Sequence, residues 1–222
     1  MRKIILAALA TTFLASPAAA ELWVGLDTSD SAPLFLEDNQ AAAAGETVAA
    51  AIRDLNRGDR IRILSFGESG VSNRQIDLTV ELSSRNRPEL IAGQVQTIIA
   101  SLPQRTRDGQ LHLETQTNAV GFLERIGPLL DCQNEPTTVL LMTDGIEWST
   151  AVTGRELLQG APLPAPSGPI LQGCHVVFWG LGQQQRGFGH DDSWYPILRT
   201  AWADFMRQAG VASFDAYGEY KR

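Results

Sequence analysis

The sequence predicts an α/β fold with a doubly wound (Rossmann-like), mostly parallel sheet, one antiparallel edge strand and helices on both faces. Strand and helix patterns alternate along the chain, which is typical of crossover units. The runs 137–142 and 176–181 are apolar throughout, as central parallel strands are. The run 75–82 instead alternates apolar and polar residues, which indicates a half-exposed edge strand.

The elements follow in order from these periodicities and from their start and stop signals. Because only a short Gly/Ser/Asn turn joins the second strand to the third, these two strands form an antiparallel hairpin. The expected strands are 21–27, 60–66, 75–82, 137–142, 175–182 and 211–217. The expected helices are 36–56, 88–102, 117–130, a brief one at 155–159, and 192–210, which ends at Gly210.

The helix expected at 88–102 begins at Pro88, a residue suited to a first helical turn. We expect a polar linker after it. Its spacing of apolar residues predicts an inward face made of Ile91, Val95, Ile98, Ile99 and Leu102.

The first twenty residues are predicted to be a signal peptide and not part of the fold. Arg2 and Lys3 precede an apolar stretch too short to span a bilayer, and small residues follow at 18–20. We expect cleavage before Glu21, which leaves one domain, residues 21–222, without a later membrane span. An uncleaved signal anchor is the alternative. The expected location is periplasmic or secreted, in a bacterium.

The charge balance argues against nucleic acid as a partner. The chain has 18 basic and 25 acidic residues, a formal net charge of −7, and loss of the leader makes it about −9. The densest basic cluster is interrupted by Asp54 and Asp59, so it is interpreted as solvated surface. That cluster comprises Arg53, Arg57, Arg60 and Arg62.

The two cysteines, Cys132 and Cys174, are expected to form a disulfide. An exported chain with an even number of cysteines usually pairs them. Each precedes an apolar strand, so the two sulfurs meet if those strands are parallel neighbours. Two separate buried thiols are the alternative.

Oxygen-bearing side chains follow the carboxyl ends of two predicted strands. Asp27 ends the first strand and is followed by Ser29 and Ser31, whereas Asp144 follows the strand 137–142. Thr117 opens the helix just before that second strand. In open α/β sheets, ligands bind outside the carboxyl ends of the strands. Two carboxylates and three hydroxyls without Cys or His are hard ligands, matched to octahedral Mg²⁺ or Mn²⁺.

This pattern resembles the metal-ion-dependent adhesion site (MIDAS) of von Willebrand factor A (vWA) domains, and the resemblance covers essentially all of the mature chain. It implies that Ser29, Ser31 and Thr117 are hydroxyl ligands of the metal. It also implies that Asp27 and Asp144 mainly orient bound water and the serines. In that family an acidic side chain of a partner protein fills the open coordination position.

Some assignments around this site stay open. Thr115 lies two residues before Thr117 and is the alternative threonine ligand, although Thr117 is preferred because it directly precedes the helix. Trp148 and His190 are candidates for a rim that contacts the partner. Phe188 and Trp194 are possible aromatic neighbours, with core packing as the alternative for Trp194.

The expected function is that of an exported, metal-dependent protein-binding module without enzymatic activity. A metal-dependent hydrolase and a structural metal lock in an envelope complex are the alternatives. Against hydrolysis, the sequence has no G-x-S-x-G motif, no P-loop and no second metal cluster. The sequence leaves the oligomeric state open.

Overall fold

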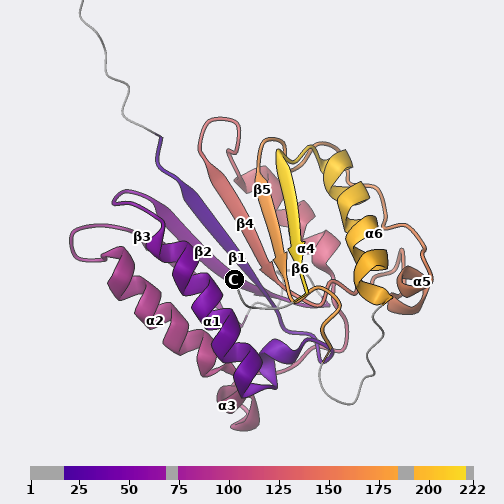
Figure 1. Cartoon of the computed structure of the whole chain (residues 1–222), viewed down its shortest axis with the longest axis horizontal. Helices are drawn as coiled ribbons and strands as arrows, with labels where there is room; N and C mark the ends of the chain where they lie inside the picture. The colour runs from indigo at the N-terminus through magenta and orange to yellow at the C-terminus, as the bar shows by residue number, and fades with distance from the viewer. Residues whose placement is uncertain (1–17, 69–74, 185–192, 219–222) are drawn as a thin grey trace, which may run out of the picture.

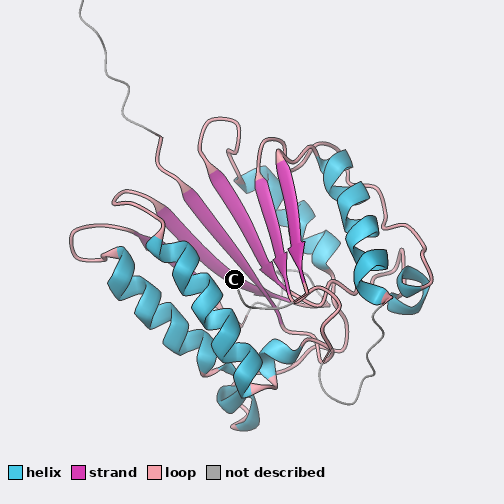
Figure 2. Cartoon of the chain, in the orientation of Figure 1, coloured by secondary structure: helices cyan, strands magenta, loops and turns pink. Residues whose placement is uncertain are grey.

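The computed structural model describes residues 18–68, 75–184 and 193–218. Within these ranges the chain forms a six-stranded sheet with the strand order β3-β2-β1-β4-β5-β6 (Figures 1 and 2). All neighbouring strands are parallel except β2 and β3, which pair antiparallel at one edge. The predicted fold class is therefore confirmed. The strands are β1 (Glu21–Asp27), β2 (Arg60–Phe66), β3 (Asp77–Glu81), β4 (Thr137–Met142), β5 (His175–Trp179) and β6 (Ser213–Tyr217).

The central strands bury side chains on both faces of the sheet. In β1, Leu22, Val24 and Leu26 belong to the core on one face, whereas Trp23 belongs to the core on the other. The strand β3 alternates exposed and half-buried residues, as expected of an edge strand. The apolar and alternating runs therefore predicted correctly that β4 and β5 are internal strands and that β3 is an edge strand.

Helices cover both faces, as expected (Figure 1). On one face lie α1 (Asp38–Arg53), α2 (Pro88–Ala100) and α3 (Leu102–Arg107). On the other lie α4 (Ala119–Ile126), α5 (Gly154–Leu158) and α6 (Trp194–Ala209). Two short 3-10 turns complete the described elements, η1 (Pro33–Phe35) and η2 (Gly127–Leu129).

Two expectations about the helix at 88–102 are wrong. The helix stops at Ala100, and α3 occupies the segment expected to be a polar linker. Pro103 has no backbone N–H to continue the first helix, yet it fits the first turn of a new one. Ile98 was expected to face inward but is 37% exposed. The buried stripe includes Ala92, which rotates it away from Ile98.

Several other elements are shorter than the sequence pattern indicates. The helix expected at 117–130 is regular only to Ile126 and continues as η2, which contains Pro128. The strand β5 ends at Trp179, because Gly180 adopts a positive φ of 94°. Gly210 ends α6 as predicted, with a left-handed φ of 81°.

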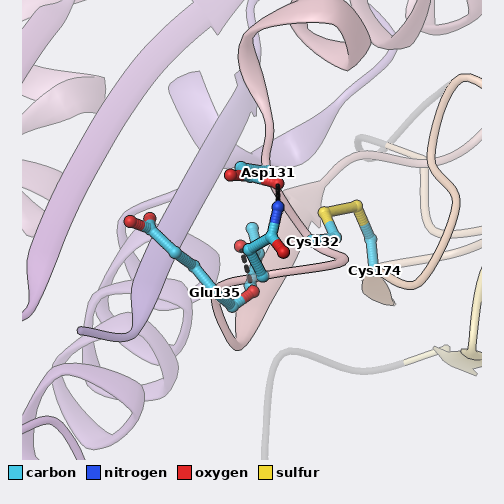
Figure 3. Close-up of a disulfide and its surroundings, with 6 residues drawn as sticks. Asp131, Cys132, Glu135 and Cys174 are labelled. Atoms are coloured by element: carbon cyan, nitrogen blue, oxygen red, sulfur yellow. Dashed lines mark hydrogen bonds between the residues drawn. A yellow bond between two sulfur atoms is a disulfide. The ribbon is translucent and has the colours of Figure 1, made fainter. Parts of the chain in front are cut away.

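Cys132 and Cys174 form the expected disulfide (Figure 3). The bridge joins the chain before β4 to the residue before β5, with a Cα–Cα distance of 4.9 Å. Gly173 makes the approach possible, because a Cβ atom there would lie 3.0 Å from the carbonyl oxygen of Cys132. The bridge thus ties the amino ends of two neighbouring strands.

The predicted signal peptide, residues 1–20, lies almost entirely outside the described residues, so its cleavage stays a prediction. Among the residues that are described, no helix is both long and apolar enough to cross a membrane.

Candidate metal centre

The predicted site residues lie at the carboxyl ends of β1 and β4, two neighbouring strands. From β1 the chain crosses to β2 on one side, whereas β4, β5 and β6 extend the sheet on the other. This boundary is the switch point of a doubly wound sheet, where ligands commonly bind. Asp27 is the last residue of β1, and Asp144 follows β4 by two residues.

Asp27 is the centre of a buried hydrogen-bond network. Its Oδ1 accepts from the backbone N–H of Ser29 at 2.9 Å, and its Oδ2 accepts from the Thr143 hydroxyl at 2.6 Å. The Thr117 hydroxyl lies 3.4 Å from both carboxylate oxygens. Loops after β1 and β4 and the start of α4 therefore meet at one carboxylate.

The two serines extend this network towards Asp144. The hydroxyl oxygens of Ser29 and Ser31 are 3.3 Å apart. The Ser31 hydroxyl also interacts with the Asp144 carboxyl. This interaction lowers the pKa of that carboxyl and so opposes the rise caused by burial. All five predicted residues, Asp27, Ser29, Ser31, Thr117 and Asp144, are thus brought together.

The Asp144 carboxylate is only half satisfied by the protein. Its Oδ1 accepts from the backbone N–H of Ile146 at 2.9 Å. Its Oδ2 is buried and has no hydrogen-bond partner among the residues that the structure describes. A buried polar atom without a partner is costly, so such an atom calls for an explanation.

The electrostatics of the site favour a cation. Burial raises the pKa of Asp27 to about 6. Burial, followed by the charge of Asp27, raises the pKa of Asp144 to about 7. Two buried carboxylates side by side are stable as anions only if a positive charge compensates them.

The donor set fits a hard divalent cation. The cluster consists of carboxylate and hydroxyl oxygens, the ligands preferred by Mg²⁺ and Mn²⁺. The described residues contain no group of three or more His, Cys, Asp or Glu side chains suited to a metal. A site here would therefore depend on its hydroxyl ligands.

The structure separates the two candidate threonines. Thr117 is buried and lies against Asp27. Thr115 is exposed, and its hydroxyl donates to Glu68 at 3.4 Å. The geometry therefore brings Thr117, and not Thr115, into the cluster.

Of the rim candidates, Trp148 is 43% exposed beside the site, and its backbone N–H donates to the carbonyl oxygen of Thr117 at 2.8 Å. Trp194 is partly buried and packs against the core. His190 and Phe188 lie outside the described residues.

Sequence reasoning gave no structural role to Glu147, which the structure places under the site. Its side chain is fully buried, and its Oε2 accepts from the backbone N–H groups of Ala119 and Val120 at 2.8 and 3.1 Å. Helix α4 has no acidic residue in its first turn, so Glu147 supplies the missing acceptor from another loop. It thereby fixes α4, and with it Thr117, against the loop after β4. The absence of an acidic residue from the first turn of α4 was the sequence signal that an acceptor must come from elsewhere in the chain.

A second anchor holds the loop after Asp144. Gly145 has a positive φ of 71°, and its carbonyl oxygen accepts from the indole N–H of Trp202 at 2.8 Å. The backbone N–H of Gly182 donates to the carbonyl oxygen of Asp144 at 2.8 Å. Helix α6 and the turn after β5 therefore set the position of Asp144.

Fold and site together define a doubly wound α/β domain with a buried cluster of oxygen ligands at its switch point. No family model and no curated protein matches the sequence. Among solved structures, an aerotolerance-related membrane protein from Bacteroides fragilis, carrying multiple mutations to serines, has a TM-score of 0.50 at 12% identity. The match covers 91% of this chain and 93% of that chain.

Other similar structures are vWA-type domains or related proteins. BatB from Bacteroides thetaiotaomicron has a TM-score of 0.48 at 12% identity, covering 90% of this chain and 91% of that chain. A von Willebrand factor type A structure from Catenulispora acidiphila has a TM-score of 0.44 at 14% identity, covering 88% and 42%. At such identities these likenesses concern the fold alone, and function must be argued from the site.

Proposed function

We propose that this chain is an extracytoplasmic vWA-type module that binds Mg²⁺ or Mn²⁺ and thereby captures an acidic side chain of a protein partner. The observation that carries the proposal is the buried oxygen cluster, in which one oxygen of Asp144 has no hydrogen-bond partner among the described residues. A bound cation would satisfy that oxygen and compensate both buried carboxylates.

The residues of the proposed site have two different roles. Ser29, Ser31 and Thr117 would supply hydroxyl ligands. Asp27 would position the Ser29 backbone and the Thr117 hydroxyl, and Asp144 would position the Ser31 hydroxyl. Because few carboxylates would contact it directly, the cation would keep enough positive charge to attract a carboxylate from outside. We propose binding and not catalysis as the outcome.

The proposed location outside the cytoplasm has two supports. The amino-terminal sequence has the pattern of a signal peptide. The disulfide between Cys132 and Cys174 suits an oxidising compartment.

The test has a binding step and a capture step. Titration calorimetry with Mg²⁺ should give a binding isotherm for the mature chain and none for Asp144→Ala. The control is Asp204→Ala, because Asp204 is an exposed carboxylate on α6. Proteins captured from a cell-envelope extract should be retained by wild type and by Asp204→Ala in Mg²⁺. They should be lost in EDTA and with Asp144→Ala.

Two results would contradict the proposal. Equal capture under all four conditions would show that the cluster is not the recognition element. Mg²⁺ binding that raises the thermal stability without changing capture would instead indicate a structural metal lock.

A further inference from the structure

A cavity of about 450 Å³ opens directly beside the oxygen cluster. Its lining includes Ser31 and Thr117, two of the three proposed hydroxyl ligands. Apolar side chains form other parts of its wall, and Figure 1 places α5 and the start of α6 near this end of the sheet. These apolar residues are Ile146, Trp148, Leu158 and Trp194. Its volume lies within the range of roughly 300 to 1,000 Å³ that ligand pockets occupy.

Trp148 is held in place on this wall. Its backbone N–H is bonded to the carbonyl oxygen of Thr117, at 2.8 Å. Its ring lies over Gly154, where an added Cβ atom would be 3.1 Å from the Trp148 Cε3 atom. The remaining 43% of its surface is exposed. A fixed, half-exposed tryptophan beside a pocket is the type of residue that most often dominates a binding interface.

The charged side chains that line the cavity include one of each sign. These are Arg155 and Asp30. The chain as a whole carries a net charge of −7, which repels an acidic partner at long range. Affinity for such a partner must therefore come from the proposed cation at the oxygen cluster and from apolar contact in the cavity.

We propose that this cavity is a second subsite, which takes a bulky apolar side chain from the same partner segment whose carboxylate is captured at the oxygen cluster. This inference rests on the proposed function and adds the second half of the recognised motif. Because Ser31 and Thr117 belong to both the cavity and the cluster, one short segment spans the two. The recognised motif is an acidic residue beside an aromatic or long aliphatic residue.

The proposal is tested by selection from displayed random peptides built around a fixed aspartate, with the mature chain as bait in Mg²⁺. Peptides enriched on wild type should carry an aromatic or long aliphatic residue at one constant spacing from the aspartate. On Trp148→Ala this preference should disappear, whereas the requirement for aspartate and Mg²⁺ should remain.

The loss of affinity caused by each substitution is then measured with the best enriched peptide. Trp148→Ala should weaken its binding by about thirty-fold, as expected for an anchor residue of an interface. Leu158→Gln, on another part of the wall, should weaken it in the same direction and covers the case in which Trp148→Ala fails to fold. The matched control is Leu129→Ala, because Leu129 is 60% exposed on η2 and does not line the cavity. Mg²⁺ affinity measured by calorimetry should be unchanged in all three variants.

The experiments distinguish failure of the proposed subsite from failure of the proposed function. Enrichment of aspartate peptides without any apolar preference, or no enrichment on wild type, overturns the subsite but leaves a measured Mg²⁺ affinity standing. Apolar peptides enriched equally in EDTA overturn both the subsite and the proposed function. If free 3-phenylpropionate displaces the best peptide at equal concentration, the ligand is a small carboxylic acid and the choice of a protein segment is overturned.

Discussion

Substituting Glu147 by glutamine should change the pH dependence of stability by a predictable amount. Burial raises the pKa of the Glu147 carboxyl from its ordinary value of 4.5 to about 7, even though two backbone N–H groups oppose the shift. Because the pKa is raised in the folded state, the neutral carboxyl is favoured there. The associated stabilisation is complete below pH 4.5 and is lost as the pH rises through 7.

The shift from 4.5 to about 7 corresponds to about 3 kcal/mol of unfolding free energy. A glutamine keeps an oxygen that can accept from Ala119 and Val120 but does not titrate. Its N–H₂ group takes the place of Oε1, which is buried without a hydrogen-bond partner among the described residues, and the desolvation cost of about 1–3 kcal/mol at this position does not vary with pH in the variant.

The assay is urea unfolding of wild type and Glu147→Gln between pH 4 and pH 8, in buffer freed of divalent metal. The free energy of unfolding of the variant, minus that of wild type, should increase by about 3 kcal/mol over this range. The subtraction removes the titration of Asp27 and Asp144 that both proteins share, and it leaves the charge interaction between Glu147 and Asp27 in the difference. Parallel curves would refute the reasoning, because they would mean that Glu147 does not titrate between these limits.

Three further outcomes are expected. Replacing Cys132 and Cys174 by serine should lower the free energy of unfolding by about 4 kcal/mol in the chain-entropy account, because the bridge closes a sequence separation of 42; urea unfolding without reductant measures this. Trp202→Phe should cost about 1–3 kcal/mol, since the buried carbonyl of Gly145 loses its donor, and should weaken Mg²⁺ binding in calorimetry. An unchanged Mg²⁺ affinity would show that the indole does not position this loop. Mg²⁺ at a hundred times its dissociation constant should stabilise the wild type by about 2.7 kcal/mol in thermal unfolding, and should leave Asp144→Ala unaffected.

Much of the fold and of the candidate site follows from local sequence signals. Asp27 and Asp144 could be placed because each ends an apolar run, and parallel strands bring their carboxyl ends to one edge of the sheet. Cys132 and Cys174 could be paired for the same reason at the opposite edge.

What could not be predicted depends on contacts between distant segments. The hydroxyl of Thr143 meets Asp27 across 116 residues, and Glu147 reaches the start of α4 across 28. Neither contact leaves a periodic trace in the sequence, because each involves one side chain in an irregular loop. The exposure of Ile98 was missed for a related reason, since tertiary packing decides how far the buried face of a helix is rotated.

Three residues of the six-residue loop 143–148 have different structural roles. Asp144 belongs to the oxygen cluster, Glu147 fixes helix α4, and Trp148 forms part of the cavity wall. A change in the backbone path of this hexapeptide therefore disturbs several properties together, whereas truncation of the Trp148 side chain alters the cavity wall alone. Another part of the wall, on α5, is formed by Arg155 and Leu158. If the proposed subsite exists, partner preference can diverge through α5 among descendants of this chain, or be redesigned there, while the residues of the proposed cation site are inherited intact.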